Sequence, residues 1–353
     1  MYQVEEVLPK SSFDLFFWIA MVMKKDILIL TDTNHDEHML SVINYIDASF
    51  YNIYTIESTK LCVDENRFLL YSDSSNDKFF ILDDRVPDIT QFHAIWLRRV
   101  TVNIDADQAM SAERKEWLAG ETRHGLTGTL MALYACRPPT QRWMNSPSAN
   151  LLSEHKLYQL QLAKKYWNIP KTYYTNSHKL FWNMLQKETV TSEYITKSLF
   201  RGFFLENNEV RVIYTNNITV PLLAGNHDAD IDNYPSLIQE SIAKKFEVRA
   251  TVVADKVYAV AIHSQESLTT QIDWRRYDLP NTPHELIQLP QSVEQACIQY
   301  CKELGLIYGA IDFIVDKNDS YWFLEINPKG QWLWLEDLTG APISKAIAEY
   351  LCG

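Results

Sequence analysis

Two carboxylates near the end of the chain, Asp312 and Glu325, are the side chains whose spacing most clearly indicates chemistry. They lie in two short strand-like runs, Ile311–Val315 and Tyr321–Ile326, on either side of the turn-forming pair Asn318-Asp319. If this pair forms the turn, antiparallel pairing sets the two carboxylates opposite one another on one face. Facing carboxylates repel, so the arrangement predicts a cation between them.

Asn327 lies two residues beyond Glu325 and shares its face, so it adds a third oxygen ligand. Oxygen ligands without His or Cys suit Mg²⁺ rather than zinc, and Mg²⁺ held by few carboxylates usually takes phosphates as its other ligands. The alternative is an acidic edge hairpin that faces water. The opposite face is apolar and is expected to be buried; it carries Ile311, Phe313, Val315, Trp322, Leu324 and Ile326.

Two lysines occupy positions that an anionic partner would explain. Lys156 lies in the first turn of a helix that we expect to begin after a Ser153 cap, where the helix dipole disfavours a cation. Lys197 shares a strand face with Ile195, which is unusual unless the lysine meets a phosphate or extends along the surface to water.

A long alternating stretch begins at Phe246, shortly after the pair Gln239-Glu240. Its apolar residues face one way, whereas Glu247, Arg249 and Thr251 face the other. The polar face either lies in solvent or belongs to a site, and the sequence leaves both interpretations open.

The composition is that of a folded, acidic protein. The chain has 353 residues, of which 46% are hydrophobic and 12% aromatic, which excludes general disorder and allows two or three lobes. Its 33 basic and 45 acidic residues give a net charge of −12, which argues against a nucleic-acid binder. The five scattered cysteines form no zinc motif, and we expect buried thiols in a reducing cytosol.

The N-terminal residues need separate treatment, because an apolar run follows Glu5 and Glu6. A secretion signal would be basic at these positions and would end in a small-residue cleavage site. The run is also too short to span a membrane, and no other stretch has the length that a spanning helix needs. We therefore expect a soluble, cytoplasmic protein without membrane contact, with an N-terminal extension over residues 1–22.

Strand and helix patterns alternate along the rest of the chain. Asp26–Thr31 predicts a buried strand followed by a helix, without the glycine pattern of a dinucleotide fold. His35 and His38 lie in the turn between them but have no third metal ligand nearby in the sequence. A long helix is predicted from Ser111 to Ala135, and the proline-rich loop after it marks a lobe boundary. A last amphipathic helix is predicted to end at Gly305.

In chain order these residues resemble the motifs of the ATP-grasp ligase superfamily. The matching positions are Lys156, Lys197, Gln239-Glu240, Glu247, Arg249, Asp312, Glu325 and Asn327, and EINPKGQW is the most specific stretch. The resemblance implies an α/β fold with α+β lobes, in which an N-terminal α/β pre-grasp domain precedes a central lobe and a C-terminal lobe that binds ATP and Mg²⁺. The implied boundaries are 1–22 for the extension, 23–140 for the pre-grasp domain, 141–190 for the central part and 191–353 for the nucleotide- and metal-binding lobes.

Within the superfamily, the chain is similar to the graspetide, or microviridin-type, peptide ligases over nearly all residues after Met23. The similar stretches include WLRR, WMNSP, HKLYQLQLA, QESIAKKFEVRATVV, IDWR and WLWLEDLTGAPIS. Such enzymes mature ribosomal precursor peptides by joining Asp or Glu side chains to Thr or Ser as esters (macrolactones) or to Lys as amides (macrolactams). The resemblance therefore implies an ADP-forming peptide ligase that acts on a leader and core peptide and is a homodimer.

The resemblance also implies a role for each matched residue. Contacts to ATP are expected from Lys156 and Lys197 at the phosphates, from Gln239, Glu240 and Ile242 at adenine, and from Glu247 at the ribose. Mg²⁺ is expected on Asp312, Glu325 and Asn327, and charge on an acyl phosphate of the peptide is expected to be stabilised by Arg249 and Arg275. The leader is expected to dock between Arg201 and Pro235, where Asp230 and Asp232 suit a basic side chain.

Two features depart from the family pattern. Only Gly202 follows the strand lysine, where many relatives have a glycine-rich lid, and the extension over residues 1–22 has no counterpart in the family pattern.

Two alternative functions also stay open. One is a ligase of the same fold that adds a free amino acid to a peptide or protein tail, and the other is a non-catalytic nucleotide-binding module.

Overall fold

The computed structural model describes residues 24–60, 67–72, 77–82, 88–101, 110–186, 193–199, 202–206, 209–212, 214–218, 235–274 and 278–353. The chain divides into two compact units, Met1–Pro147 with Ser344–Gly353, and Ser148–Ile343. The predicted N-terminal extension lies outside the described residues. Among the helices that the structure describes, none has the length and apolar character needed to cross a membrane.

The first unit is built on a four-stranded parallel sheet in the order β2-β1-β5-β6. Its strands are β1 (Lys25–Thr31), β2 (Tyr51–Glu57), β5 (Ala94–Leu97) and β6 (Arg142–Met144). The central residues of β1 and β5 are almost fully buried, which is typical of a parallel sheet covered on both faces. The predicted α/β opening is therefore confirmed.

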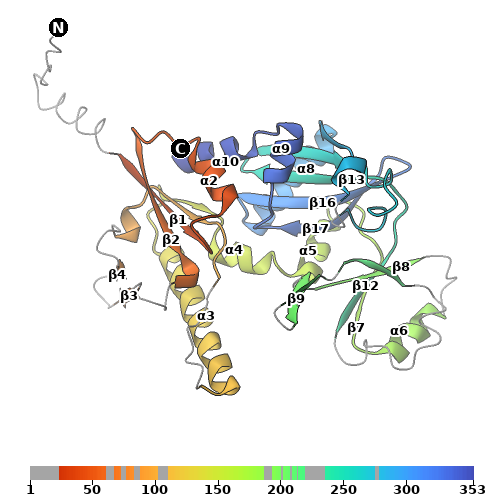
Figure 1. Cartoon of the computed structure of the whole chain (residues 1–353), viewed down its shortest axis with the longest axis horizontal. Coiled ribbons are helices and arrows are strands. Elements are labelled where there is room, and N and C mark those ends of the chain that lie inside the picture. Colours follow the sequence, from red (N-terminus) through yellow and green to blue (C-terminus); the bar gives the residue numbers. More distant parts are fainter. Residues whose placement is uncertain are drawn as a thin grey trace, which may run out of the picture. The chain divides into compact units, whose positions relative to one another are not determined.

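Three helices accompany this sheet: α2 (Glu37–Ile43), α3 (Ala112–Ala135) and α10 (Ile343–Cys352). Helix α3, which Figure 1 labels, begins at a Ser111 cap. Its Leu126, Leu130 and Leu133 pack against apolar residues of β1 and β5. The C-terminal helix α10 belongs here because Tyr51 donates a hydrogen bond of 2.7 Å to the carbonyl of Cys352. The unit also contains an antiparallel pair, β3 (Arg67–Ser72) and β4 (Asp77–Leu82), and two short 3-10 helices, Ser58–Lys60 and Ile89–Gln91.

The described part of the second unit contains a four-stranded and a five-stranded antiparallel sheet. The smaller one has the order β11-β8-β12-β7, from β7 (Thr172–Thr175), β8 (Tyr194–Lys197), β11 (Asn216–Ile218) and β12 (Ser236–Glu240). Helix α6 (His178–Leu185) begins at a Ser177 cap, whose side chain accepts from the backbone N–H of Leu180, and packs Phe181 and Leu185 against this sheet. A separate hairpin is formed by β9 (Phe203–Glu206) and β10 (Glu209–Val212).

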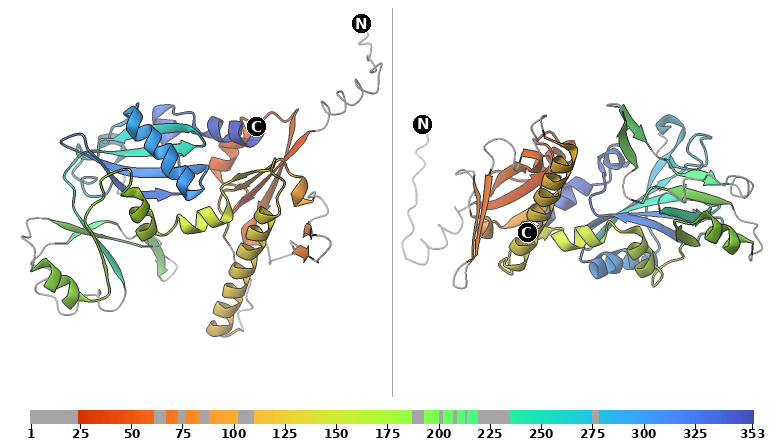
Figure 2. Two further views of the ribbon diagram at one scale, coloured as in Figure 1. Left: turned by 180° about the vertical axis from the view of Figure 1, so that it is seen from behind. Right: turned by 90° about the horizontal axis from the view of Figure 1, so that it is seen from below.

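The larger sheet has five strands in the order β15-β14-β13-β16-β17. They are β13 (Lys244–Val253), β14 (Lys256–Ile262), β15 (His284–Ile287), β16 (Tyr308–Asp316) and β17 (Tyr321–Asn327). Helix α8 (Gln291–Leu304) lies across one face of this sheet (Figure 2) and ends at Gly305, whose φ of 72° is the left-handed cap that the sequence predicts. Three further helices belong to the unit: α4 (Pro147–Leu152), α5 (Lys156–Ala163) and α9 (Leu333–Thr339).

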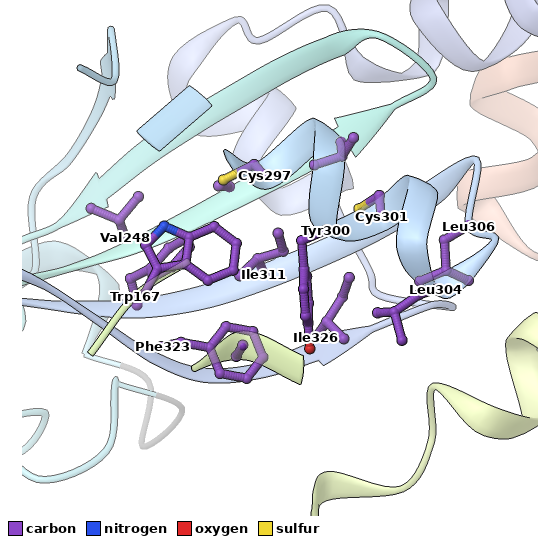
Figure 3. Close-up of a cluster of buried hydrophobic side chains, with 14 of the residues drawn as sticks. Trp167, Val248, Cys297, Tyr300, Cys301, Leu304, Leu306, Ile311, Phe323 and Ile326 are labelled. Carbon is purple, nitrogen blue, oxygen red and sulfur yellow. The ribbon is translucent and has the colours of Figure 1, made fainter. Parts of the chain in front are cut away.

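An aromatic cluster fills the space between α8 and the five-stranded sheet (Figure 3). Phe323 is fully buried and stacks on Trp167, with a ring-centroid distance of 5.8 Å and an interplanar angle of 8°. Tyr300 packs edge-on against both rings and donates a hydrogen bond of 2.9 Å to the carbonyl of Gln159. The rigid cluster fixes the buried face of β16 and β17 and thereby the direction of the opposite face.

The prediction of buried thiols is confirmed for two cysteines and wrong for a third. Cys297 and Cys301 are buried in the cluster under α8, and burial raises the pKa of both thiols. Cys136, by contrast, is exposed, because it caps the end of α3 rather than packing into a core.

The pairing of β16 with β17 confirms the predicted register at the site but not at the turn. Asp312 lies opposite Glu325, as expected. The connecting loop is longer than two residues, because the Asp316 carboxylate accepts hydrogen bonds from the backbone N–H groups of Asn318 and Ser320. A bulge between Asp312 and Phe313 restores the register.

The bulge changes which residues of β17 are buried. Phe323 pairs with Phe313 and lies in the core, whereas Leu324 lines a pocket on the opposite face. The predicted burial of Leu324 on the core face is therefore wrong. A strand with one extra residue reverses the side-chain alternation beyond that point.

Candidate functional site

A pocket of about 230 Å³ lies in the second unit and is lined by parts of both antiparallel sheets. The small sheet supplies Ile195 and Lys197 from β8, which confirms that these two side chains share a face. The five-stranded sheet supplies carboxylates, and the segment after β12 connects the two sets. Six of the predicted site residues line this one pocket: Lys197, Glu240, Ile242, Glu247, Asp312 and Glu325.

Asp312 is held by an arginine from the neighbouring strand. Arg249 on β13 lies opposite Asp312 on β16, and its Nη1 donates to both carboxylate oxygens at 2.8 Å. Both side chains are largely shielded, with exposed fractions of 8% and 13%. Burial lowers the pKa of Arg249, but the charge and hydrogen bonds of Asp312, together with the nearby Tyr308 and Glu325, outweigh burial, so that the pKa is raised.

Glu325 is held by the predicted first-turn lysine. Lys156 is the first residue of α5, and its Nζ lies 2.5 Å from Oε2 of Glu325. This ion pair supplies the anionic partner that the placement of Lys156 at a helix N-terminus requires. The predicted Ser153 cap is wrong, because α5 begins after His155, whereas the backbone of Ser153 donates to Ala149 in the turn that ends α4.

Glu247 is buried in the pocket wall rather than exposed to solvent. Its Oε1 accepts hydrogen bonds from Lys244 at 2.6 Å and from Ser264 at 3.0 Å. Burial raises the pKa of Glu247, and the two donors offset part of that effect. With Arg249 and Thr251 also buried, the polar face of β13 belongs to a site and not to a solvated surface.

The Gln239-Glu240 pair ends β12 at the edge of the pocket. Gln239 is fully buried and donates from Nε2 to Thr172 Oγ1 at 2.9 Å. It therefore links β12 to β7 within the small sheet and does not line the pocket. Glu240 and the following residues through Lys244 line the pocket directly. This segment joins the small sheet to β13, and the backbone N–H groups of Glu240 and Ser241 donate to the carbonyls of Lys171 and Glu193 at 2.9 and 2.8 Å.

Other pocket residues were not singled out from the sequence. Lys244 lies before a register shift in β13, and Asp273 accepts a hydrogen bond of 3.0 Å from the backbone of Thr215. Trp274 stacks on Trp334 with a centroid distance of 4.9 Å. The i, i+3 spacing of Lys244 and Glu247 could have indicated their ion pair from the sequence. The contacts of Asp273 and Trp274 join segments that are distant in the sequence, so no local pattern indicates them.

Asn327, a predicted metal ligand, does not line the pocket, and three other predicted site residues lie outside the described residues. Asn327 ends β17 and is exposed, and its Oδ1 accepts from the backbone N–H of Lys329 at 2.9 Å. Asn327 thus shapes the turn after the strand in this structure. Arg275, Asp230 and Asp232 lie outside the described residues.

The donor set fits Mg²⁺ together with phosphate. Asp312 and Glu325 are cross-strand neighbours whose oxygens line one pocket, and Lys197 lines the same pocket. Within the described ranges, no group of three or more His, Cys, Asp or Glu side chains is placed to hold a metal ion. Two carboxylates suit Mg²⁺ that shares its shell with phosphate oxygens, and the adjacent lysines suit the phosphates themselves.

Comparison with protein-family models matches both parts of the chain. Residues 26–146 match the MvdD pre-ATP grasp domain, and residues 160–351 match the RimK-like ATP-grasp domain. Comparison with curated protein sequences gave no match.

Several solved structures are similar over nearly the whole chain. A Chryseobacterium gregarium RiPP-associated ATP-grasp ligase, in complex with ADP and a leader and core peptide, is 26% identical with a TM-score of 0.79, covering 93% of this chain and 96% of that chain. The macrocyclase MdnC from Microcystis aeruginosa MRC, bound with precursor peptide MdnA, is 27% identical with a TM-score of 0.76, covering 92% and 99%. The macrocyclase MdnB from the same organism shares the fold at 22% identity, with a TM-score of 0.73 and coverage of 93% and 99%.

Proposed function

This chain belongs to the RimK-like ATP-grasp family, and on that basis we propose that it ligates side chains within a ribosomal precursor peptide. It is an ADP-forming ATP-grasp ligase that uses ATP and Mg²⁺. The proposed substrate carboxylates are Asp or Glu side chains, and the proposed acceptors are Thr or Ser hydroxyls or Lys amines of the same peptide. The predicted three-part division of the chain, with boundaries at 140 and 190, stays part of this proposal.

The observation that carries the proposal is the pairing of Asp312 with Glu325 in one pocket with Lys197. Whole-chain similarity to two ligases solved with precursor peptides supports a peptide substrate over a free small molecule. The proposed reaction has two steps. A peptide carboxylate attacks the γ-phosphorus of ATP to give an acyl phosphate and ADP, and a hydroxyl or amine then attacks the acyl carbon and releases phosphate.

The predicted site residues have separate proposed tasks. Lys156 and Lys197 bind phosphate oxygens as point charges, Glu240 and the backbone near Ile242 bind adenine, and Glu247 accepts from the ribose hydroxyls. Asp312 and Glu325 would hold Mg²⁺, with Asn327 proposed as a further ligand, and the ion would supply positive charge that offsets the negative charge of the ATP phosphates. Arg249, held beside Asp312, and Arg275 stabilise negative charge on the activated carboxylate.

The direct test uses a precursor peptide rich in Thr, Ser, Asp and Glu, to be sought in a short reading frame next to this gene. Incubation with Mg-ATP should release one ADP per bond, and each bond should reduce the peptide mass by one water. Treatment with hydroxylamine should cleave macrolactones and leave macrolactams intact. A peptide whose mass increases only when a free amino acid is supplied would instead establish the alternative ligase.

Lys197→Ala should weaken ATP binding at least tenfold, or by about 1.4 kcal/mol, because a charged hydrogen bond to phosphate is lost. The motive is the position of Lys197 in the pocket beside Ile195. Calorimetric titration with ATP measures the change, and Lys179→Ala on the exposed surface of α6 is the matched control. Equal ATP affinity in the two variants would remove Lys197 from the proposed nucleotide site.

The leader dock is proposed from the sequence between Arg201 and Pro235. Replacing both Asp230 and Asp232 by Asn should weaken leader binding severalfold and leave ATP binding nearly unchanged, because only the acidic cluster loses charge. Fluorescence anisotropy with a labelled leader measures the first effect and calorimetry the second. Unchanged leader affinity would place the dock elsewhere.

The homodimer is proposed on the resemblance to the family, and light scattering of the purified protein tests it.

A further inference from the structure

The two carboxylates assigned to Mg²⁺ are each paired with a separate protein cation. Arg249 contacts both oxygens of Asp312 at 2.8 Å, and Lys156 lies 2.5 Å from Glu325. The cations come from different elements, β13 and α5, and approach neighbouring positions of the β16–β17 pair. Two negative and two positive charges therefore balance within this group.

These ion pairs are shielded from solvent, so their charges act strongly on one another. The exposed fractions are 8% and 13% for Arg249 and Asp312, and 16% and 23% for Lys156 and Glu325. Charges of this kind are screened much less than pairs on an open surface. A divalent cation that approaches the same oxygens would be repelled by a guanidinium and an ammonium within a few ångströms.

We propose that Lys156 and Arg249 compete with Mg²⁺ for Glu325 and Asp312, so that the metal is accepted together with a nucleotide polyphosphate and not alone. The inference rests on the metal assignment in the proposed function. When the metal displaces Lys156 from Glu325, the polyphosphate supplies a new negative partner for the lysine. Arg249, displaced from Asp312, becomes available to the carboxylate of the peptide.

Competition of this kind makes metal binding and nucleotide binding mutually dependent. Each ligand removes part of the electrostatic cost of binding the other, and the coupling must be equal in both directions. Neutralising either Lys156 or Arg249 should therefore raise the affinity for a divalent metal in the absence of nucleotide. It should also reduce the factor by which nucleotide increases the affinity for the metal. Loss of a structural contact does not predict tighter metal binding, so the sign of the change separates the two explanations.

The test is titration with Mn²⁺, which is detected by its electron paramagnetic resonance, in the presence and absence of ADP. Lys156→Gln should bind Mn²⁺ alone at least tenfold more tightly than the wild type, and ADP should enhance its Mn²⁺ affinity less. Lys245→Gln is the matched control, because it removes the same charge from β13 where Lys245 pairs with Asp319 at 2.6 Å. The control should bind Mn²⁺ like the wild type.

Arg249→Gln provides an independent second variant, with the same expected sign. One result would refute the proposed competition and leave the metal site intact. In that result, Lys156→Gln binds Mn²⁺ alone no more tightly than Lys245→Gln, although the wild type binds Mn²⁺ in the presence of ADP. If Mn²⁺ binding with ADP is unchanged by Glu325→Gln, the proposed metal site itself is wrong. Should Arg249→Gln not fold, the result for Lys156→Gln decides alone.

Discussion

Glu325→Gln is expected to reduce peptide ligation at least 100-fold while the protein keeps its fold. The substitution preserves the shape of the side chain and its acceptor oxygen toward Lys156 but removes one negative charge from the proposed Mg²⁺ shell. A 100-fold loss corresponds to about 2.7 kcal/mol of transition-state stabilisation, which is typical for one electrostatic group at an active site. The side chain faces the pocket and not the aromatic core, so packing should be unaffected.

The measurements are ADP release and peptide mass for activity, and the melting temperature for the fold. Glu303→Gln is the matched control, because this carboxylate lies on α8 and pairs with Lys165 away from the pocket. The control should ligate at the wild-type rate. A folded Glu325→Gln variant with wild-type ligation would refute the assignment of Glu325.

Phe323→Ala is expected to lower the free energy of unfolding by about 3–5 kcal/mol. Phe323 is fully buried, stacks on Trp167 and contacts Tyr300 edge-on (Figure 3). It also contacts Phe313 edge-on. Truncation to Ala removes apolar burial and leaves a cavity, and it also removes several favourable aromatic pairs. Urea-induced unfolding followed by tryptophan fluorescence measures the loss.

Leu268→Ala is the control for this prediction, because Leu268 is 90% exposed and should change stability by less than about 0.5 kcal/mol. A loss below about 1 kcal/mol for Phe323→Ala would contradict the close packing of the cluster. The two substitutions on β17 should also differ in kind. Glu325→Gln should affect chemistry with little change in stability, and Phe323→Ala should affect stability.

The sequence predicts the placement of the polar side chains in this pocket where the signal is local. Alternation in β13 and β16 places Arg249 and Asp312 on the polar face, and the pairing of Asp312 with Glu325 follows from one hairpin. The position of the bulge was not predictable in the same way. It depends on hydrogen bonds from the loop backbone to Asp316 and on the burial of Phe323, and both become visible only with the strands paired.

Contacts between distant segments account for the remaining differences. The polar face of β13 was compatible with solvent exposure until β16 supplied Asp312 and α5 supplied Lys156. The cap at Ser153 failed because Pro147 begins a separate short helix, and Ser153 belongs to the turn that closes it. The stack of Trp274 on Trp334 joins residues that no local pattern relates.

The most direct test of the central claim follows the oxygen atoms of the peptide. A precursor peptide with ¹⁸O in its Asp and Glu side-chain carboxylates is incubated with the enzyme and Mg-ATP, and the released phosphate is analysed by mass spectrometry. Activation as an acyl phosphate predicts one ¹⁸O in phosphate for each bond formed, together with ADP as the nucleotide product. Phosphate without ¹⁸O, or label in AMP, would contradict carboxylate phosphorylation at this site.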